Sequence, residues 1–347
     1  MSLPFSPPPY RPPRWLRNGH SNTIFSFLKP RPTPPAAFLA AQRDHWLALE
    51  PGTRALMRGH WQAASAPALL LVHGLEGSSE AGYMLSTAVK AWQRGWHVVR
   101  ANVRGCGDSD LECDSLYNSG LSGDADQMLR WLLAQPGVTQ AALAGFSMGG
   151  NIVLKYAGEV GDAAPDGLRA VVAVSAPLDL GPAADALHRP ANRLYERRFL
   201  RGLTARVRGR ALRHPGRFRV ERLGEVNSVR AFDHLITAPF YNYRDADDYY
   251  HRAAAARVVD GIRVPTLVIH AEDDPFIVLT PATRARLAAN PAVHLLAVPH
   301  GGHCGFMGNQ VPGEDTYWAE NRAVEFCVEQ VAGERVAVGG TKTDFGF

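Results

Sequence analysis

Short, largely apolar runs recur along the chain and alternate with longer stretches in which apolar and polar positions are mixed. A run that is apolar at successive positions predicts a strand buried on both faces. Such runs occupy residues 68–72, 97–102, 141–145, 170–175, 266–270 and 293–298. The mixed stretches predict helices, and the clearest of them occupy residues 80–94, 122–135 and 148–159. Two opening strands are expected at 44–49 and 54–61, with the turn Glu50-Pro51-Gly52 between them.

This alternation indicates an α/β protein with a mostly parallel, doubly wound sheet. It stops between residues 177 and 255, where the composition favours helices and no buried strand is recognisable. We interpret 177–255 as a helical lid insertion over the carboxyl end of the sheet, where open α/β sheets place their sites. The core then comprises 37–176 and 256–336. Residues 1–36 form a proline-rich arm expected to wrap the surface without regular elements, and 337–347 form a C-terminal tail.

Composition narrows the class of protein. Apolar residues make up 46% and charged residues 20% of the 347 residues, which favours a large buried core over disorder. The net charge of +4 is too small to indicate nucleic-acid binding, so no nucleic-acid partner is expected. Four scattered cysteines do not suggest a disulfide framework. With no apolar run of about 18 residues and no signal-peptide pattern at the start, the chain is expected in the reducing cytoplasm.

The strongest chemical signal is Gly145-Phe146-Ser147-Met148-Gly149-Gly150, which lies between a predicted strand and a predicted helix. A nucleophilic serine needs a sharp turn that exposes its hydroxyl, and glycines two residues before and after it allow that turn. The helix start also directs N–H groups toward developing negative charge. We therefore predict that Ser147 is a nucleophile, the alternative being an ordinary serine in a glycine-rich turn.

A serine nucleophile needs a histidine base and a carboxylate that orients it, and in this architecture the acid precedes the histidine. Asp274 follows the seventh predicted strand and is our choice of acid, with Asp273 as the alternative. His303 follows the last predicted strand between glycines that leave it room to reach across, with His300 as the alternative. A zinc site at these histidines and Cys304 is disfavoured, because no second cluster supplies the remaining ligands.

An oxyanion hole is also required, because acyl transfer builds negative charge on the carbonyl oxygen. One donor is expected to be the backbone N–H of Met148, directly after the nucleophile. The second is assigned to the N–H of Leu75 in the loop after the third strand. His73 in that loop is expected to be structural and to fix the loop by hydrogen bonds.

Beyond these residues, the chain resembles the α/β-hydrolase superfamily and, within it, the YheT-like family. The broad resemblance rests on HGLEG at 73–77, GFSMGG at 145–150 and the acid and histidine loops. The narrower one rests on segments without an expected catalytic duty: WLRNGH at 15–20 with TI at 23–24, NVRGCGDS at 102–109, FD at 232–233, TAP at 237–239, YY at 249–250 and HGGHCGF at 300–306. Together they extend over most of the chain.

The resemblance implies hydrolysis of carboxylic esters with short- to medium-chain acyl groups or lipid-like structure, without a metal or organic cofactor. The family's Ser–Asp–His residues correspond to Ser147, Asp274 and His303. Asn118, Asn22 and the pair at 253–254 depart from the residues common in the family, which puts only a close transfer of substrate preference in doubt. A lipase or phospholipase, a thioesterase or an acyltransferase with the same acyl-enzyme remains open, as does a non-catalytic ligand-binding protein on this scaffold. A haloalkane or epoxide hydrolase is disfavoured, because such enzymes have a carboxylate in place of the serine.

The positive charge is gathered in one place. Residues 189–222 contain twelve arginines and two acids, a formal charge of +10 against +4 for the whole chain. One interpretation is a basic lid that attracts anionic substrates or an anionic membrane surface. The other is a solvated helical lid whose arginines pair with acids elsewhere. An RNA-binding face is disfavoured, because no recognised nucleic-acid module surrounds the arginines.

Overall fold

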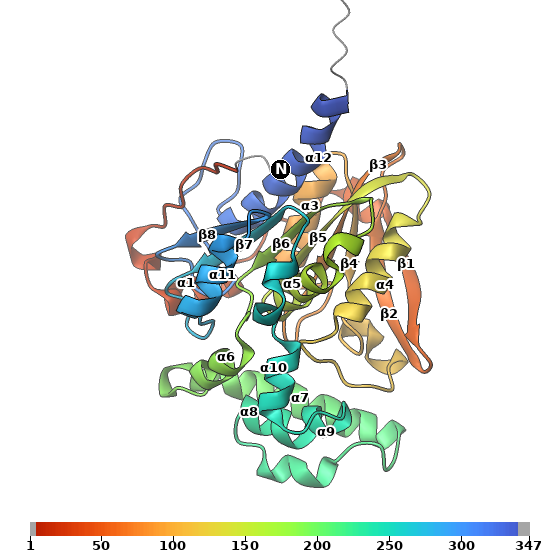
Figure 1. Ribbon diagram of the computed structural model, residues 1–347, viewed down its shortest axis with the longest axis vertical. Coiled ribbons are helices and arrows are strands. Elements are labelled where there is room, and N and C mark those ends of the chain that lie inside the picture. Colours follow the sequence, from red (N-terminus) through yellow and green to blue (C-terminus); the bar gives the residue numbers. More distant parts are fainter. Residues whose placement is uncertain (1–4, 339–347) are drawn as a thin grey trace, which may run out of the picture.

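A sheet of eight strands forms the centre of the molecule (Figure 1). The computed structural model describes residues 5–338. The strands are β1 (Gln42–Glu50), β2 (Thr53–His60), β3 (Ala66–Val72), β4 (His97–Ala101), β5 (Val138–Phe146), β6 (Leu168–Val174), β7 (Thr266–Ala271) and β8 (Val293–Val298). Their order is β1-β2-β4-β3-β5-β6-β7-β8; β2 is antiparallel to β1 and β4, and the other neighbours are parallel. The predicted α/β fold with a mostly parallel sheet is confirmed.

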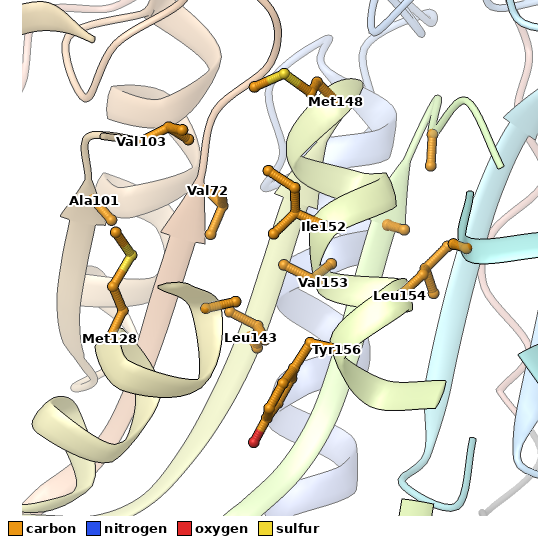
Figure 2. Packing of buried hydrophobic residues seen from close by; sticks show 14 of the residues in the cluster. Val72, Ala101, Val103, Met128, Leu143, Met148, Ile152, Val153, Leu154 and Tyr156 are labelled. Carbon is orange, nitrogen blue, oxygen red and sulfur yellow. The ribbon is translucent and has the colours of Figure 1, made fainter. Parts of the chain in front are cut away.

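Helices cover both faces of this sheet, because successive side chains of a buried strand point to opposite sides. One face packs against α4 (Ser122–Leu133), α5 (Met148–Val160) and α11 (Pro281–Ala289), and the other against α3 (Gly82–Gln93) and α12 (Trp318–Val338). Figure 2 shows Ile152 and Val153 of α5 facing Val72 of β3 and Leu143 of β5. Each such side chain contributes about 1.5–3 kcal/mol when fully buried. The packing of α5 therefore fixes the turn between β5 and α5, which carries Ser147.

The chain between β6 and β7 is helical, as its composition predicts. We call residues 177–255 the helical segment; it contains α6 (Leu180–Leu187), α7 (Arg193–Arg213), α8 (Val229–Phe232), a π-helical turn (Asp233–Thr237), α9 (Ala238–Phe240) and α10 (Ala246–Ala253). These helices lie together at one end of the sheet (Figure 1). Several of their side chains line one cavity with Ser147, which follows β5, so this end is the carboxyl end of the parallel strands.

The expectation that residues 1–36 lack regular elements is wrong. A short 3₁₀-helix (Arg14–Leu16) is followed by α1 (Gly19–Leu28), and α2 (Ala36–Ala40) begins at the end of the arm. The residues of α1 lie between the prolines at 13 and 30, so none interrupts its hydrogen bonds. The side chain of Asn18 caps the helix by accepting the N–H of Ser21 at 3.2 Å.

The buried face of α1 is unusual in being small and polar, with Gly19, Asn22 and Ser26. Its exposed face carries Ile24, Phe27 and Leu28, so the usual amphipathic pattern is inverted.

The C-terminal residues 339–347 of the predicted tail lie outside the described residues, and the tail's first two positions belong to α12. Among the described residues, no helix combines the length and the apolar character needed to cross a lipid bilayer.

Candidate active site

Ser147 occupies the tight turn between β5 and α5. Its φ of 52° and ψ of −123° are strained for a residue with a side chain. A Cβ on Gly145 would lie 2.2 Å from the carbonyl oxygen of Gly149, and a Cβ on Gly149 would lie 2.4 Å from the carbonyl oxygen of Val72. The glycines are therefore required by close backbone contacts, and the turn they permit brings the serine side chain to the cavity below the helical segment.

A hydrogen-bonded chain of three side chains begins at this serine. His303 Nε2 lies 2.9 Å from Ser147 Oγ, and His303 Nδ1 lies 2.9 Å from Asp274 Oδ2. The Asp274 carboxylate is fully buried, and its Oδ1 accepts the backbone N–H groups of Phe276 and Ile277 at 3.1 and 3.0 Å. With Nδ1–H donating to the carboxylate, Nε2 is left to accept the serine proton.

The electrostatics of His303 favour its protonation. Burial lowers the pKa of the imidazole, but the neighbouring Cys304 sulfur and the Asp274 carboxylate raise it more, so the net pKa lies above its ordinary value. The carboxylate thus stabilises the imidazolium ion that forms when the ring accepts a proton.

The alternative acid and base contact each other instead of the serine. His300 Nδ1 lies 3.3 Å from Asp273 Oδ2, and Asp273 Oδ1 accepts the N–H of Gly302 at 2.9 Å. This second pair joins the loop after β7 to the loop after β8. Of the four residues considered for the two roles, only Asp274 and His303 are in line with Ser147.

The two residues whose N–H groups are expected to bind an oxyanion lie at the same cavity as Ser147. Met148 is the first residue of α5, so its N–H has no partner within the helix. Leu75 and Met148 line one cavity with Ser147. The loop of Leu75 presses against the serine, because a Cβ on Gly74 would lie 2.9 Å from Ser147 Cβ. Gly74 also donates its N–H to Tyr83 Oη at 3.0 Å, which holds the loop in place.

His73 has the structural role expected of it. Its Nδ1 lies 2.8 Å from the carbonyl oxygen of Gly74, and its Nε2 accepts the N–H of Val103 at 3.0 Å. Burial lowers the pKa of the ring to about 4, so it remains neutral near pH 7.

The cavity in front of Ser147 has a volume of about 100 Å³ and a mostly apolar lining. Leu180, Leu187, Phe199 and Leu203 of the helical segment line it together with Phe276, whose ring also packs against His303 at 4.2 Å between centroids. An apolar chain is therefore the chemistry that most of this lining suits.

Sequence reasoning missed the support that the N-terminal arm gives to the histidine loop. Thr23 Oγ1 accepts the backbone N–H of His303 at 2.8 Å, and Asn22 Oδ1 accepts that of Met307 at 3.0 Å. Helix α1 and the histidine loop are in close contact, since a Cβ on Gly302 would lie 2.4 Å from the carbonyl oxygen of Gly19. The sequence feature that could have indicated this support is the family resemblance at 15–24, in residues to which no catalytic role was assigned.

Part of the basic charge of α7 is paired with acids of the core. Arg206 forms an ion pair with Glu76 at 3.2 Å, and both Arg206 and Arg210 donate to the carbonyl oxygen of Gly105 at 2.6 and 2.7 Å. Arg210 is fully buried and lies 3.1 Å from Asp110. The inner face of α7 is thus bound to the loop that carries Leu75 and to the loop after β4.

The outer face of α7 carries arginines that face solvent. These are Arg193, Arg197, Arg198, Arg201 and Arg208. Within the described part of the chain none of them has an ion pair. At about 3.6 residues per turn, they spread over roughly 140° of the helix circumference. The pairing expected for a solvated lid therefore holds for the inner arginines, and the outer arginines stay available for the anionic contact that the other interpretation predicts.

Within residues 5–338, no group of three or more His, Cys, Asp or Glu side chains is arranged to hold a metal ion.

Known proteins similar to this chain agree with the fold and the broad class of chemistry. The protein named putative esterase YheT, from Escherichia coli (strain K12), is 35% identical over 263 residues, covering 75% of this chain and 76% of that protein. Monoacylglycerol lipase of Saccharomyces cerevisiae is 30% identical over 248 residues, covering 69% and 55%. Phospholipase ABHD3 of Mus musculus is 30% identical over 260 residues, covering 74% and 62%.

Solved structures show the same fold at lower identity. The esterase Pf2001 of Pyrococcus furiosus superposes with a TM-score of 0.55 at 14% identity, covering 86% of this chain and 98% of that one. Residues 67–310 match the model of the family described as the alpha/beta hydrolase fold. The chain therefore belongs to the α/β-hydrolase superfamily and, within it, to the YheT-like family.

Proposed function

We propose that the protein is a serine hydrolase that cleaves carboxylic esters through Ser147, His303 and Asp274. The observation that carries this proposal is the hydrogen-bonded chain from Asp274 through His303 to Ser147, which ends at an apolar cavity. The membership of the chain in the α/β-hydrolase superfamily supports it.

The first half of the reaction forms an acyl-enzyme. The Ser147 hydroxyl attacks the ester carbonyl carbon while its proton passes to His303 Nε2, and Asp274 stabilises the resulting imidazolium. The oxyanion accepts hydrogen bonds from the N–H groups of Leu75 and Met148. When the carbon–oxygen bond breaks, the alcohol leaves with the proton from His303, and the acyl group remains on Ser147.

The second half releases the acid. Water attacks the acyl carbon and gives a proton to His303, the tetrahedral intermediate collapses, and Ser147 recovers its proton. An acyltransferase would use an alcohol in place of water, and adding alcohol acceptors to the assay would reveal transfer products.

The substrates we propose are esters with short- to medium-chain acyl groups or with lipid-like structure. The apolar lining of the cavity supports them, and relatives of the chain are named monoacylglycerol lipase and phospholipase. A lipase or phospholipase is therefore the second candidate, and the dependence of kcat/KM on acyl length separates it from an esterase for short chains.

The test is hydrolysis of a graded series of acyl esters by the purified protein and by Ser147→Ala. The substitution removes the nucleophile and should lower kcat about 10⁵–10⁶-fold. Ser65→Ala, an exposed serine outside the cavity, is the matched control and should leave kcat unchanged. Labelling by a fluorophosphonate should be lost in Ser147→Ala alone; ester hydrolysis that survives this substitution would refute the assignment.

We further propose that the outer face of α7 and the exposed face of α1 together contact an anionic lipid surface. The two faces are neighbours, because the Arg198 guanidinium lies 4.3 Å from the centre of the Phe27 ring. Phe27 and Leu28 are 65% and 67% exposed, and Leu194 of α7 is 78% exposed. Apolar side chains beside unpaired arginines suit the boundary of a membrane that contains anionic lipids.

Sedimentation with phosphatidylcholine vesicles that either lack or contain about 30% phosphatidylserine tests this contact. The charge reversals Arg197→Glu and Arg201→Glu together should abolish the part of binding that depends on anionic lipid. Arg43→Glu with Arg94→Glu changes the net charge equally on exposed residues elsewhere and should retain binding. Equal loss in both double variants, or no binding by the unaltered protein, would overturn the proposal.

A further inference from the structure

A carboxyl group lines the mostly apolar cavity in front of Ser147. Asp233 is the one charged side chain among the described residues of the lining. It begins the π-helical turn Asp233–Thr237, a rare backbone form that occurs often at functional sites. None of the steps proposed for ester hydrolysis uses it, so its presence calls for a separate explanation.

The contacts of Asp233 leave it acceptor capacity. Thr237 donates its hydroxyl to Oδ1 at 2.8 Å, and Tyr250 donates its hydroxyl to Oδ2 at 2.7 Å. A carboxylate offers about four acceptor positions, so roughly one on each oxygen remains. Thr237 and Tyr250 line the same cavity as the carboxylate, which therefore belongs to a polar wall of the cavity.

No cation among residues 5–338 forms an ion pair with this carboxylate. The charge of Arg230 lowers the pKa of Asp233, but the Arg230 guanidinium pairs with Asp185 at 2.8 Å and with Asp247. Burial raises the pKa of Asp233 to about 6, against the hydrogen bonds from Tyr250 and Thr237. A carboxyl group taken out of water without a cation is costly, and a ligand that donates hydrogen bonds to it would reduce that cost.

The remaining walls of the cavity differ in chemistry. Leu180 and Leu187 come from α6, and Phe199 and Leu203 come from α7. These side chains offer no hydrogen-bonding group to a ligand, so they suit the acyl chain. The polar wall is then left for the alcohol part of the ester.

We propose that Asp233, with Thr237 and Tyr250, binds a free hydroxyl group on the alcohol part of the substrate. The preferred substrates are then partial esters of polyhydroxy alcohols, in which one hydroxyl is acylated and another donates a hydrogen bond to Asp233. This inference rests on the proposed function, because it places an ester at Ser147, and it adds the class of alcohol. A site that hydrogen-bonds a substrate hydroxyl discriminates against the analogue that lacks it.

The test compares two esters that share the acyl group and a three-carbon alcohol, glyceryl monobutyrate and propyl butyrate. The unaltered protein should show the higher kcat/KM on the glyceryl ester. Asp233→Asn should lower the ratio of the two kcat/KM values about tenfold, mainly through KM for the glyceryl ester. Asp162→Asn, the same substitution at an exposed acid outside the cavity, should leave the ratio unchanged.

Tyr250→Phe gives a second measurement. It removes the hydroxyl that donates to the Asp233 carboxylate and retains the ring, and it should lower the same ratio. Labelling of Ser147 by an alkyl fluorophosphonate reports whether each variant is folded. A variant that labels normally and keeps the full ratio would overturn the hydroxyl subsite, as would an unaltered protein with equal kcat/KM on both esters. Failure of the proposed function would look different, because neither ester would be hydrolysed in a manner that depends on Ser147.

Discussion

Two adjacent aspartates, Asp273 and Asp274, occupy different positions although they are neighbours in the chain. Asp274 is fully buried, accepts two backbone N–H groups and contacts His303. Asp273 contacts His300 and the backbone of Gly302. The difference arises from the turn after β7, which directs consecutive side chains to different partners. At the scale of single residues, the structure thus separates the acid that contacts His303 from an acid that joins two loops.

Replacing each aspartate in turn tests this separation. Asp274→Asn should lower kcat about 10³–10⁴-fold, because an amide no longer stabilises the imidazolium or holds the required tautomer. Asp273→Asn keeps the contact between His303 and Asp274 and should lower kcat less than about tenfold. Steady-state kinetics on one short-chain ester measures both variants, and the reverse order of effects would exchange the two roles.

At the scale of elements, the N-terminal helix α1 packs against the histidine loop and supports it. The contacts are backbone to backbone or through short side chains, so they depend on the small residues of its buried face. A Cβ on Gly19 would lie 1.8 Å from the carbonyl oxygen of Asp273. The helix therefore cannot take a larger residue there without moving away from both loops.

Gly19→Ala is expected to displace α1 and with it the histidine loop. Both kcat and the free energy of unfolding should fall, the latter by about 1–3 kcal/mol, as overpacking usually costs. Gly123→Ala is the matched control, because a Cβ there meets nothing within 4 Å and lies in helix α4. The control should be neutral or stabilising by up to about 1 kcal/mol. Urea unfolding measures the free energy of unfolding, and ester kinetics measure kcat. Equal effects of the two substitutions would contradict the role of α1.

Sequence patterns predicted the eight strands, the helices α3, α4 and α5, and the three residues in line at the serine. They did not predict α11, α12 or the support that α1 gives to the histidine loop. Strands such as 141–145 are encoded locally by apolar runs, and Ser147 is marked by glycines at fixed spacing. The hydrogen bond between Thr23 and His303 joins residues 280 positions apart, and no local pattern encodes it. The same holds for Asp233, which was noted only as part of a family resemblance, because its cavity exists only in the folded chain.

At the scale of the whole molecule, the arginines of α7 divide by face. The inner face concentrates Arg206, Arg210 and Arg213 around Asp110 in the loop after β4. The outer face adds arginines that nothing in the described residues neutralises. A mildly acidic core and a basic helical segment are therefore joined by charges, and the small net charge of the chain conceals this arrangement.

Removing Asp110 should weaken that junction. Asp110→Asn leaves three arginines, one of them fully buried, without the carboxylate they share. Breaking a buried pair from one side is expected to lower the free energy of unfolding by about 3 kcal/mol. Asp126→Asn removes one partner of an exposed pair with Arg130 on helix α4 and should change it by about 0.5 kcal/mol or less. Urea denaturation measures both, and similar values for the two variants would show that Asp110 does not secure the helical segment.

The hydrogen bond between Thr23 of α1 and the backbone of His303 has a consequence for the order in which the site forms during synthesis. Thr23 leaves the ribosome 280 residues before its partner His303, which at about 5–20 residues per second is a delay of roughly 14 to 56 s. During synthesis the helix has no histidine loop to pack against, and Ser147 has no histidine beside it. Under the mechanism proposed above, a nascent or truncated chain is therefore unable to attack an ester until the last strand and its loop have joined the first helix.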